Sequence, residues 1–497
     1  MFSWPSLLRS PVTALAGVLL VLVSFWAGST LQPLTRYDQT FYLGIAYDLR
    51  HTGRFTDGYD FAIPDASGNR PSGMRFVPLY PALLAAAAAL EPGFRAAMDC
   101  TVENHDAGTS CPTTAKLVRG TQFAMLAAVY VMVWWIAGAL TGSLRGAWIG
   151  VVLALGTAPY LLRSVNYLMT EMTALFLTTL LATAGVAAIR SRHPWRWAGV
   201  AGVTLGLLAL TRPAFLYLFV AAAVTGGVAA VFAGQFRRRA AAFLLVALVA
   251  GFALPVGPWI LRNAVVLERP ALSFGYASHT LVQRISYDAM TWREYGLFYV
   301  CGLPDGTGLG ELLDGPGACD RFGLDERPTT FYAIGIGPML EQTLAAAGGY
   351  EHHLSYLLDH YILREPLKHA LVSIPMALRG AWVQHYWGLV LGPVCLVLTI
   401  GALRRRHAGF LVLALPAWFM LVFNAVVAVN QVRYNLMLVP PYAVAGAMVI
   451  ERRLSRSRFG AGSGFTAAGP GNHPPASRCQ RVQTCWPPLM CNSLPVT

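Results

Sequence analysis

Two carboxylates stand where polar stretches of this chain meet its apolar runs. Asp38 follows the first apolar run, residues 12–31, and Glu171 opens a later apolar run. A carboxylate at such an edge can act as a general base that takes a proton from a hydroxyl group. Asp38 can equally be the N-cap of a helix predicted over 39–51, which would end at Gly53. Glu171 can equally be placed in the first turn of its helix by the helix dipole.

Five arginines lie in the polar stretches beside the apolar runs: Arg75, Arg163, Arg212, Arg262 and Arg433. The planar guanidinium presents a fork of donors that matches the oxygens of a phosphate group. Arginines so placed could hold a phosphate and stabilise negative charge on it. Each of them alone can also extend its stem along the membrane and place its charge among lipid headgroups.

The elements that must position these residues are membrane helices. Of the 497 residues, 55% are hydrophobic and only 12% are charged, and the mean hydropathy is +0.50. Soluble domains carry about a quarter charged residues, whereas several apolar runs in this chain reach roughly 20 residues, enough to cross a bilayer. We therefore predict an all-α polytopic membrane protein. Its spans, about ten in number, lie near 12–31, 117–140, 147–162, 168–189, 197–211, 213–233, 241–260, 386–403, 408–429 and 436–450.

The arginine-rich loops predict the orientation of these spans, because positive residues concentrate on the cytoplasmic side of membrane proteins. With the N-terminus in the cytoplasm, the cytoplasmic loops hold the basic clusters at 190–196, 237–239, 404–406 and 452–458. The two large polar stretches, the first polar segment (32–116) and the second polar segment (262–376), then lie outside. The net charge of +13 is concentrated in these short loops, so it does not argue for nucleic acid.

We expect one membrane domain over residues 1–454. After about residue 455 the chain becomes rich in Gly, Pro and Ser without apolar periodicity, which predicts a disordered cytoplasmic tail over 455–497. The cysteines of the polar segments come in two closely spaced pairs, Cys100 with Cys111 and Cys301 with Cys319. Such spacing predicts two local disulfides in an oxidising compartment. The alternative is four free thiols.

Short strings in the chain form an ordered set. They are Asp38 with Tyr42, Gly53-Arg54-Phe55, Arg75 followed by Pro78-Leu79-Tyr80-Pro81, Thr170-Glu171, Leu210-Thr211-Arg212-Pro213, Pro258-Trp259 with Arg262-Asn263, and Arg433-Tyr434. Over residues 36–450, this set resembles the GT-C superfamily of integral-membrane glycosyltransferases. The resemblance is closest to a bacterial branch similar to protein O-mannosyltransferases and lipid A aminoarabinose transferases.

The resemblance implies an activity and roles for these residues. Such enzymes take a sugar from a polyprenyl-phosphate carrier and pass it to a glycan, lipid or protein acceptor. Asp38 matches the acid assigned as catalytic base, and Glu171 matches a second acid. Arg433 and Arg212 are the best-placed cations for the lipid phosphate. Arg75 and Arg262 are further candidates for the phosphate, and Tyr42, Tyr80 and Tyr434 for the substrate pocket.

The resemblance also implies a location and bears on cofactors. We expect a multi-pass protein of the bacterial inner membrane with both termini in the cytoplasm and the active site on the periplasmic face. Some relatives bind a divalent metal, and this chain shows no clear ligand set, so metal dependence stays open. The transfer needs no covalent intermediate, which predicts a single inverting displacement.

Two other functions compete with the transferase. A transporter or flippase of lipid-linked sugars predicts charged or broken helices near the bilayer midplane, whereas the polar residues of this chain gather at the predicted outer ends of spans. Asn424 and Asn430 are the nearest exceptions. An envelope oligosaccharide ligase or polymerase would depend on outer Arg and His residues more than on Asp38. The sequence has no P-loop and no dinucleotide-binding fingerprint, which argues against a nucleotide-fuelled pump.

Overall fold

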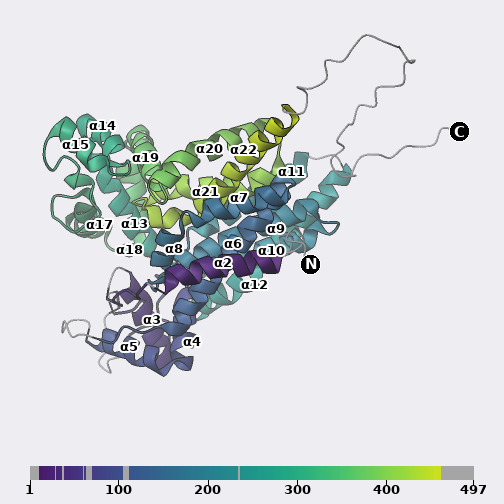
Figure 1. The fold of residues 1–497 in the computed structure, drawn as a ribbon. Helices are drawn as coiled ribbons and strands as arrows, with labels where there is room; N and C mark the ends of the chain where they lie inside the picture. The colour runs from purple at the N-terminus through teal and green to yellow at the C-terminus, as the bar shows by residue number, and fades with distance from the viewer. Residues whose placement is uncertain are drawn as a thin grey trace, which may run out of the picture. The chain divides into compact units, whose positions relative to one another are not determined.

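The computed structural model describes residues 11–27, 29–35, 38–59, 61–62, 70–104, 111–232 and 235–460. Every regular element in these ranges is a helix (Figure 1), which confirms the predicted all-α class. Residues 1–452 form one compact unit and 453–497 a second. Most of the predicted tail, from residue 461 onward, lies outside the described residues.

Within these ranges, five helices are long and apolar enough to cross a membrane. They are α6 (Lys116–Thr141), α9 (Glu171–Arg190), α12 (Gln235–Leu267), α20 (Tyr386–Arg405) and α21 (Ala408–Val427). Two shorter helices, α7 (Leu144–Leu155) and α8 (Ala158–Val165), are bent by 60° at the break between them and give a sixth span if they count as one. The chain is therefore a multi-pass membrane protein.

Four further helices occupy the other predicted spans. They are α2 (Pro11–Trp26), α10 (Pro194–Ala209), α11 (Phe215–Phe232) and α22 (Val439–Gly460). A helix of 16 residues, such as α2 or α10, rises about 24 Å, less than the roughly 30 Å of a bilayer core. The count of ten spans therefore stays a prediction.

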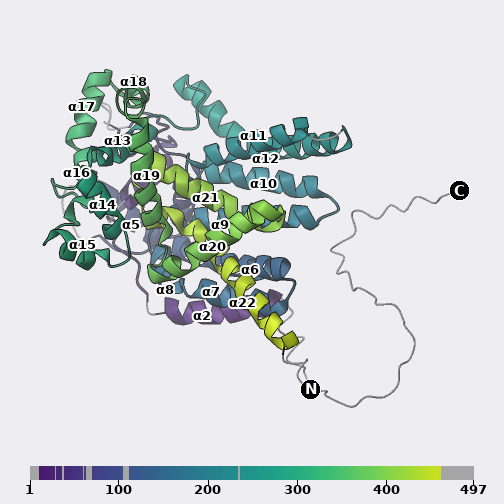
Figure 2. The same cartoon turned by 90° about the horizontal axis from the view of Figure 1, so that it is seen from above.

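Close packing between α10 and α12 depends on glycine. The α10 helix packs against both α9 and α12, and Figure 2 shows α10 and α12 side by side. A Cβ built at Gly202 of α10 would lie 2.1 Å from the carbonyl oxygen of Leu248, and one at Gly251 of α12 would lie 2.3 Å from that of Gly199. Small residues at these positions let the two backbones approach, as is common between membrane helices.

The first polar segment folds as three helices, α3 (Gln39–Thr52), α4 (Leu79–Leu90) and α5 (Pro92–Glu103). They enclose a small apolar core that includes Leu43, Tyr80 and Phe94. The predicted end of α3 is confirmed, since Gly53 has a φ of +68° and its N–H bonds to the Leu49 carbonyl.

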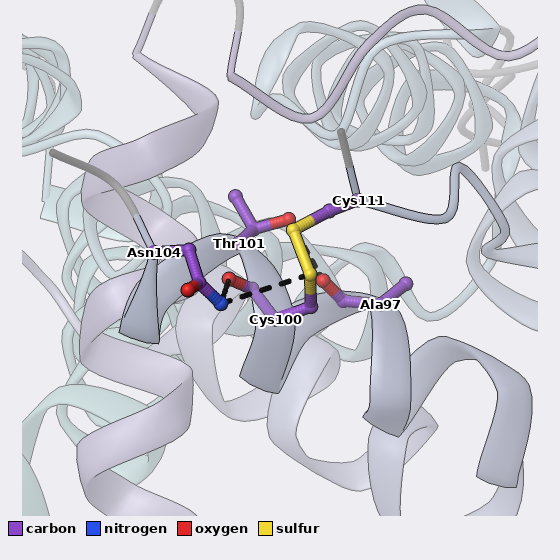
Figure 3. The surroundings of a disulfide bond; sticks show 5 residues. All are labelled: Ala97, Cys100, Thr101, Asn104 and Cys111. Atoms are coloured by element: carbon purple, nitrogen blue, oxygen red, sulfur yellow. Dashed lines mark hydrogen bonds between the residues drawn. A yellow bond between two sulfur atoms is a disulfide. The ribbon is translucent and has the colours of Figure 1, made fainter. Parts of the chain in front are cut away.

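Each polar segment contains one disulfide. Cys100 near the end of α5 is bonded to Cys111 (Figure 3), across a sequence separation of 11 residues. Asn104 donates from Nδ2 to the Cys100 carbonyl over 3.0 Å, which fixes the last turn of α5 beside the bridge. In the second polar segment, Cys301 is bonded to Cys319 across 18 residues.

The second polar segment is a group of short helices gathered at one end of the membrane helices (Figure 2). They are α13 (Tyr276–Ile285), α14 (Trp292–Cys301), α15 (Gly306–Asp314), α16 (Phe331–Ile336), α17 (Pro338–Ala347), α18 (Tyr350–Leu357) and α19 (Pro366–Ala381). Aromatic rings dominate its core, with Tyr287, Phe298, Phe322 and Phe331 in contact.

A buried arginine joins this segment to the membrane helices. Arg284 at the end of α13 is fully buried. Its guanidinium donates to the carbonyl oxygens of Ala425 in α21 (2.7 Å) and His369 in α19 (3.0 Å), and pairs with Asp288 at 2.8 Å. The His369 ring lies 2.6 Å from the same carboxylate. Although burial raises it, hydrogen bonds from His369 and Arg284 hold the pKa of Asp288 below its usual value.

Candidate functional site

Four charged side chains from four distant stretches of the chain meet in one place. Asp38, Glu171, Arg212 and Arg433, called below the four-charge cluster, form two ion pairs that share one tyrosine ring. Four of the residues that the sequence singled out are therefore brought together by the fold. The contacts below show how each is held.

Asp38 is the N-cap residue of α3 by position, but its carboxylate does not cap the helix. Its side chain makes no cap hydrogen bond to the helix, so the N-cap alternative is wrong for the carboxylate. Instead, Asp38 Oδ2 accepts a hydrogen bond from Arg433 Nη2 at 3.1 Å, across 395 residues of sequence. About a third of the Asp38 side chain, 32%, is exposed, so a ligand can reach this carboxylate.

Arg433 is fixed by several neighbours in the 3-10 stretch Val432–Leu438 that follows α21. Its Nε donates to Gln431 Oε1 at 2.7 Å, and its Nη1 lies 3.6 Å from Met169 Sδ. Its Nη2 also lies 3.4 Å from the hydroxyl of Tyr434. These contacts orient the guanidinium toward Asp38 and toward the start of α9.

Glu171 is the first residue of α9 and is 5% exposed. Arg212 Nη2 lies 2.8 Å from Glu171 Oε1, and Arg212 Nε donates to the Thr170 hydroxyl at 2.7 Å. Both carboxylate oxygens of Glu171 are buried and neither accepts a hydrogen bond in the described ranges, so its contact with Arg212 is an ion pair. Glu171 thus combines the helix-dipole position with an ion pair and a carboxylate oxygen that a ligand or water could satisfy.

The Tyr434 ring joins the two ion pairs. The guanidinium carbon of Arg212 lies 5.3 Å from the ring centroid and that of Arg433 lies 5.1 Å from it, within the range of cation–π attraction. Two guanidinium groups are therefore held close together. The two carboxylates and the face of the Tyr434 ring offset the repulsion between them. The formal charge of the cluster is zero.

Aromatic side chains line the cluster on the side of the first polar segment. The Tyr42 ring packs edge-on against Tyr80 at 5.3 Å and Phe76 at 6.1 Å. Burial, followed by the Asp38 charge, raises the pKa of the Tyr42 phenol well above its usual value. Tyr42 therefore remains a hydrogen-bond donor at all physiological pH values.

Tyr276 completes this aromatic lining and was missed by the sequence analysis. It begins α13, its ring lies 5.1 Å from Phe76, and burial followed by the Asp38 charge raises its pKa. An aromatic residue at the start of a short helix carries no sequence signal. Only the folded second polar segment brings it beside Asp38.

Arg262 lies outside the four-charge cluster. Its Nη2 donates to the Phe55 carbonyl at 3.0 Å and its Nη1 to the Gly73 carbonyl at 2.9 Å. The guanidinium therefore donates hydrogen bonds to two backbone carbonyls of the first polar segment. The observed contacts make Arg262 a clamp that links Phe55 to Gly73.

Arg75 lies in a second polar group, away from the four charges. Its guanidinium stacks between the rings of Phe61 (4.6 Å) and Tyr350 (4.5 Å). Its buried Nη1 has no hydrogen-bond partner among the residues described, and neither have the Nδ1 atoms of His279 and His353. Burial, followed by the Arg75 charge, lowers the pKa of His279 to about 4, so this ring is neutral at pH 7.

The described residues contain no group of three or more His, Cys, Asp or Glu side chains placed to hold a metal ion. The four-charge cluster offers two carboxylates, and both are paired with guanidinium groups. Chemically, the site can accept a proton at a carboxylate and hold an oxyanion with guanidinium donors.

No protein-family model and no curated protein match this chain. The solved structures similar to it include two of ArnT from Cupriavidus metallidurans, one bound to undecaprenyl phosphate and one in the apo state. Each is 15% identical in sequence to this chain, and each alignment covers 90% of this chain and 79% of the ArnT chain. The TM-scores are 0.36 and 0.35. At these TM-scores the likeness carries no weight for the chemistry of the site, which follows from its own side chains.

Proposed function

We propose that this chain is a glycosyltransferase that moves a sugar from a polyprenyl-phosphate carrier to an acceptor hydroxyl. The observation that supports this most is the contact of 3.1 Å between Asp38 and Arg433 inside the four-charge cluster. A partly exposed carboxylate for the acceptor proton and guanidinium donors for a phosphate stand side by side. The ordered strings that resemble GT-C transferases include all four residues of the cluster.

The reaction is a single displacement at the anomeric carbon of the sugar. The acceptor oxygen forms a bond to that carbon while the bond from the carbon to the phosphate oxygen breaks. Asp38 takes the proton of the acceptor hydroxyl. The polyprenyl phosphate leaves with the bonding electron pair, and the configuration at the anomeric carbon is inverted.

Charge develops on the departing phosphate, and Arg212 and Arg433 are placed to stabilise it. The described residues use Nε and Nη2 of Arg212, so Nη1 remains a donor for a phosphate oxygen. Tyr434 keeps both guanidinium groups in place by its ring face. Glu171 holds Arg212 from the far side and limits where the cation can move.

The two other arginines take different places in the proposal. Arg75 stays a candidate for an anionic substrate group, because its buried Nη1 lacks a partner in the described part of the chain. Arg262 is assigned to holding Phe55 and Gly73 together through their carbonyl groups. No step passes through a metal, since the described side chains do not form a ligand set.

The membrane setting fits this chemistry. A polyprenyl tail is apolar and would lie between membrane helices, while its phosphate would meet the cluster at the helix ends. We propose the bacterial inner membrane, with both termini in the cytoplasm and the cluster on the periplasmic side, from the arginine pattern of the loops.

A flippase would also bind a lipid-linked sugar, so the test must separate transfer from movement. Purified protein in liposomes is given a synthetic polyprenyl-phosphate sugar and an envelope extract as acceptor. The proposal expects free polyprenyl phosphate and sugar on the acceptor. Movement of intact carrier across the bilayer without sugar transfer would overturn it.

A further inference from the structure

The start of α9, where Thr170 and Glu171 stand, follows a stretch that is not helical. Helix α8 ends at Val165, and α9 begins only at Glu171. Backbone groups in such a stretch lack the internal partners of a helix and must find others. The positions of these hydrogen-bond partners therefore determine the position of the Glu171 carboxylate.

The first partner is Gln39, the residue next to Asp38. Its side chain is fully buried. Its Nε2 donates to the Pro33 carbonyl at 3.0 Å, and its Oε1 accepts from the Leu168 N–H at 2.7 Å. One amide therefore links Pro33, which precedes Asp38 in the chain, to Leu168, which precedes Glu171. The bond from Gln39 to Leu168 spans 129 residues of sequence.

The second partner is Gln122, from the second turn of α6. It is 1% exposed, and its Nε2 donates to the carbonyls of Val165 (3.1 Å) and Tyr167 (2.9 Å). Its Oε1 lies 3.5 Å from the Tyr80 hydroxyl. One turn earlier on α6, Arg119 donates to Asn166 Oδ1 at 2.7 Å.

We propose that Gln39 and Gln122 are positioning residues, which hold the 165–168 stretch so that Glu171 and its partner Arg212 meet Asp38 and Arg433. This inference rests on the proposed function for its catalytic consequence. Both amides hold the stretch by bonds to its backbone, and neither bonds to a residue of the four-charge cluster in any hydrogen bond described above. Their loss would displace a pre-assembled site, since a shift of about 1 Å can cost about 100-fold in rate.

The chemistry of an amide suggests a diagnostic substitution. Gln39 must accept at one atom and donate at the other. In Gln39→Glu, the carboxylate can still accept the Leu168 N–H, but only its protonated form can donate to the Pro33 carbonyl. Burial favours that neutral form. The variant should therefore hold the stretch at acid pH and lose its hold as the carboxyl ionises.

Two readouts test the proposal on the full-length protein in lipid. Hydrogen exchange of a peptide containing Leu168 reports directly on the hydrogen bond between Gln39 and the Leu168 N–H. Sugar transfer from the synthetic carrier reports the consequence of that bond for the reaction. In Gln39→Met we expect faster exchange and a kcat about 100-fold lower, with the KM for the carrier within about threefold of the wild-type value. In Gln39→Glu we expect both properties to approach wild type at low pH and to worsen as the pH rises.

Gln342→Met is the matched control, since Gln342 is an exposed glutamine on α17, and it should change neither readout. Wild-type exchange and wild-type kcat in Gln39→Met would overturn the inference. If Gln39→Met does not fold, the pH profile of Gln39→Glu decides, and a profile parallel to wild type would overturn it. A wild-type protein that transfers no sugar would overturn the proposed function alone, because hydrogen exchange at Leu168 still tests whether Gln39 holds the 165–168 stretch.

Discussion

Removing the Arg284 side chain should detach the second polar segment from the membrane helices. Arg284→Met keeps the apolar stem but takes the guanidinium from the Asp288 carboxylate, which is 16% exposed and keeps the His369 ring as a partner, and removes this donor from the Ala425 carbonyl. Breaking a buried pair in this way costs about 3–5 kcal/mol. At 1.4 kcal/mol per factor of ten, this lowers the folded-to-unfolded ratio roughly 100- to 4,000-fold.

The assay is thermal unfolding of purified protein in detergent, combined with limited proteolysis of the second polar segment. Arg293→Met is the control, because Arg293 in the same segment is 79% exposed and pairs with Asp314 at the surface, where such pairs contribute less than about 1 kcal/mol. Arg284→Met combined with Asp288→Asn should be less unstable than Arg284→Met alone, since the carboxylate that has lost its guanidinium is then also removed. A loss below about 1 kcal/mol in Arg284→Met would refute this account of how the segment is held.

Three further predictions concern the site and the second polar segment. Arg433→Lys should lower transfer about 100-fold without unfolding, because an ammonium cannot reach Asp38 and the other partners at once; normal transfer would contradict the role. Replacing Cys301 and Cys319 by Ser should cost about 2–4 kcal/mol, measured as faster proteolysis of the segment, and unchanged proteolysis would contradict it. The pKa of His279 is about 4 in the folded state and about 6.5 when unfolded, so acidification favours unfolding. Stability should fall by about 2 kcal/mol between pH 7 and pH 5 relative to His279→Gln, and equal pH dependence of the two proteins would contradict the buried, neutral ring.

Local features of the fold could be predicted because their causes are local. The end of α3 depends on Gly53, whose left-handed conformation is read from one residue type and its place after an apolar pattern. The cysteines in each polar segment are bonded within that segment, as close spacing suggests. The sequence predicts a span from about residue 168, whereas α9 begins at Glu171. The backbone just before it is bonded to Gln39 and Gln122, which lie far away in the sequence.

The sequence predicts which residues belong to the site, but it does not predict how they are arranged. Asp38 and Arg433 are 395 residues apart, so no periodicity relates them. The sequence makes Arg262 a candidate phosphate ligand, and only the fold shows that its guanidinium donates to two carbonyl groups of the first polar segment. The fold of the second polar segment escaped prediction because its short helices are held by buried contacts such as those of Arg284, which have no sequence pattern.

The most direct test compares sugar transfer by the wild-type protein with that by Asp38→Asn, both purified and in lipid, from a synthetic polyprenyl-phosphate sugar. Asp99→Asn is the matched control, since Asp99 lies in the same polar segment beside His51 and outside the four-charge cluster. We predict that the wild type and Asp99→Asn transfer sugar, and that Asp38→Asn stays folded and loses transfer. Transfer that persists in Asp38→Asn would contradict the assignment of Asp38 as the base.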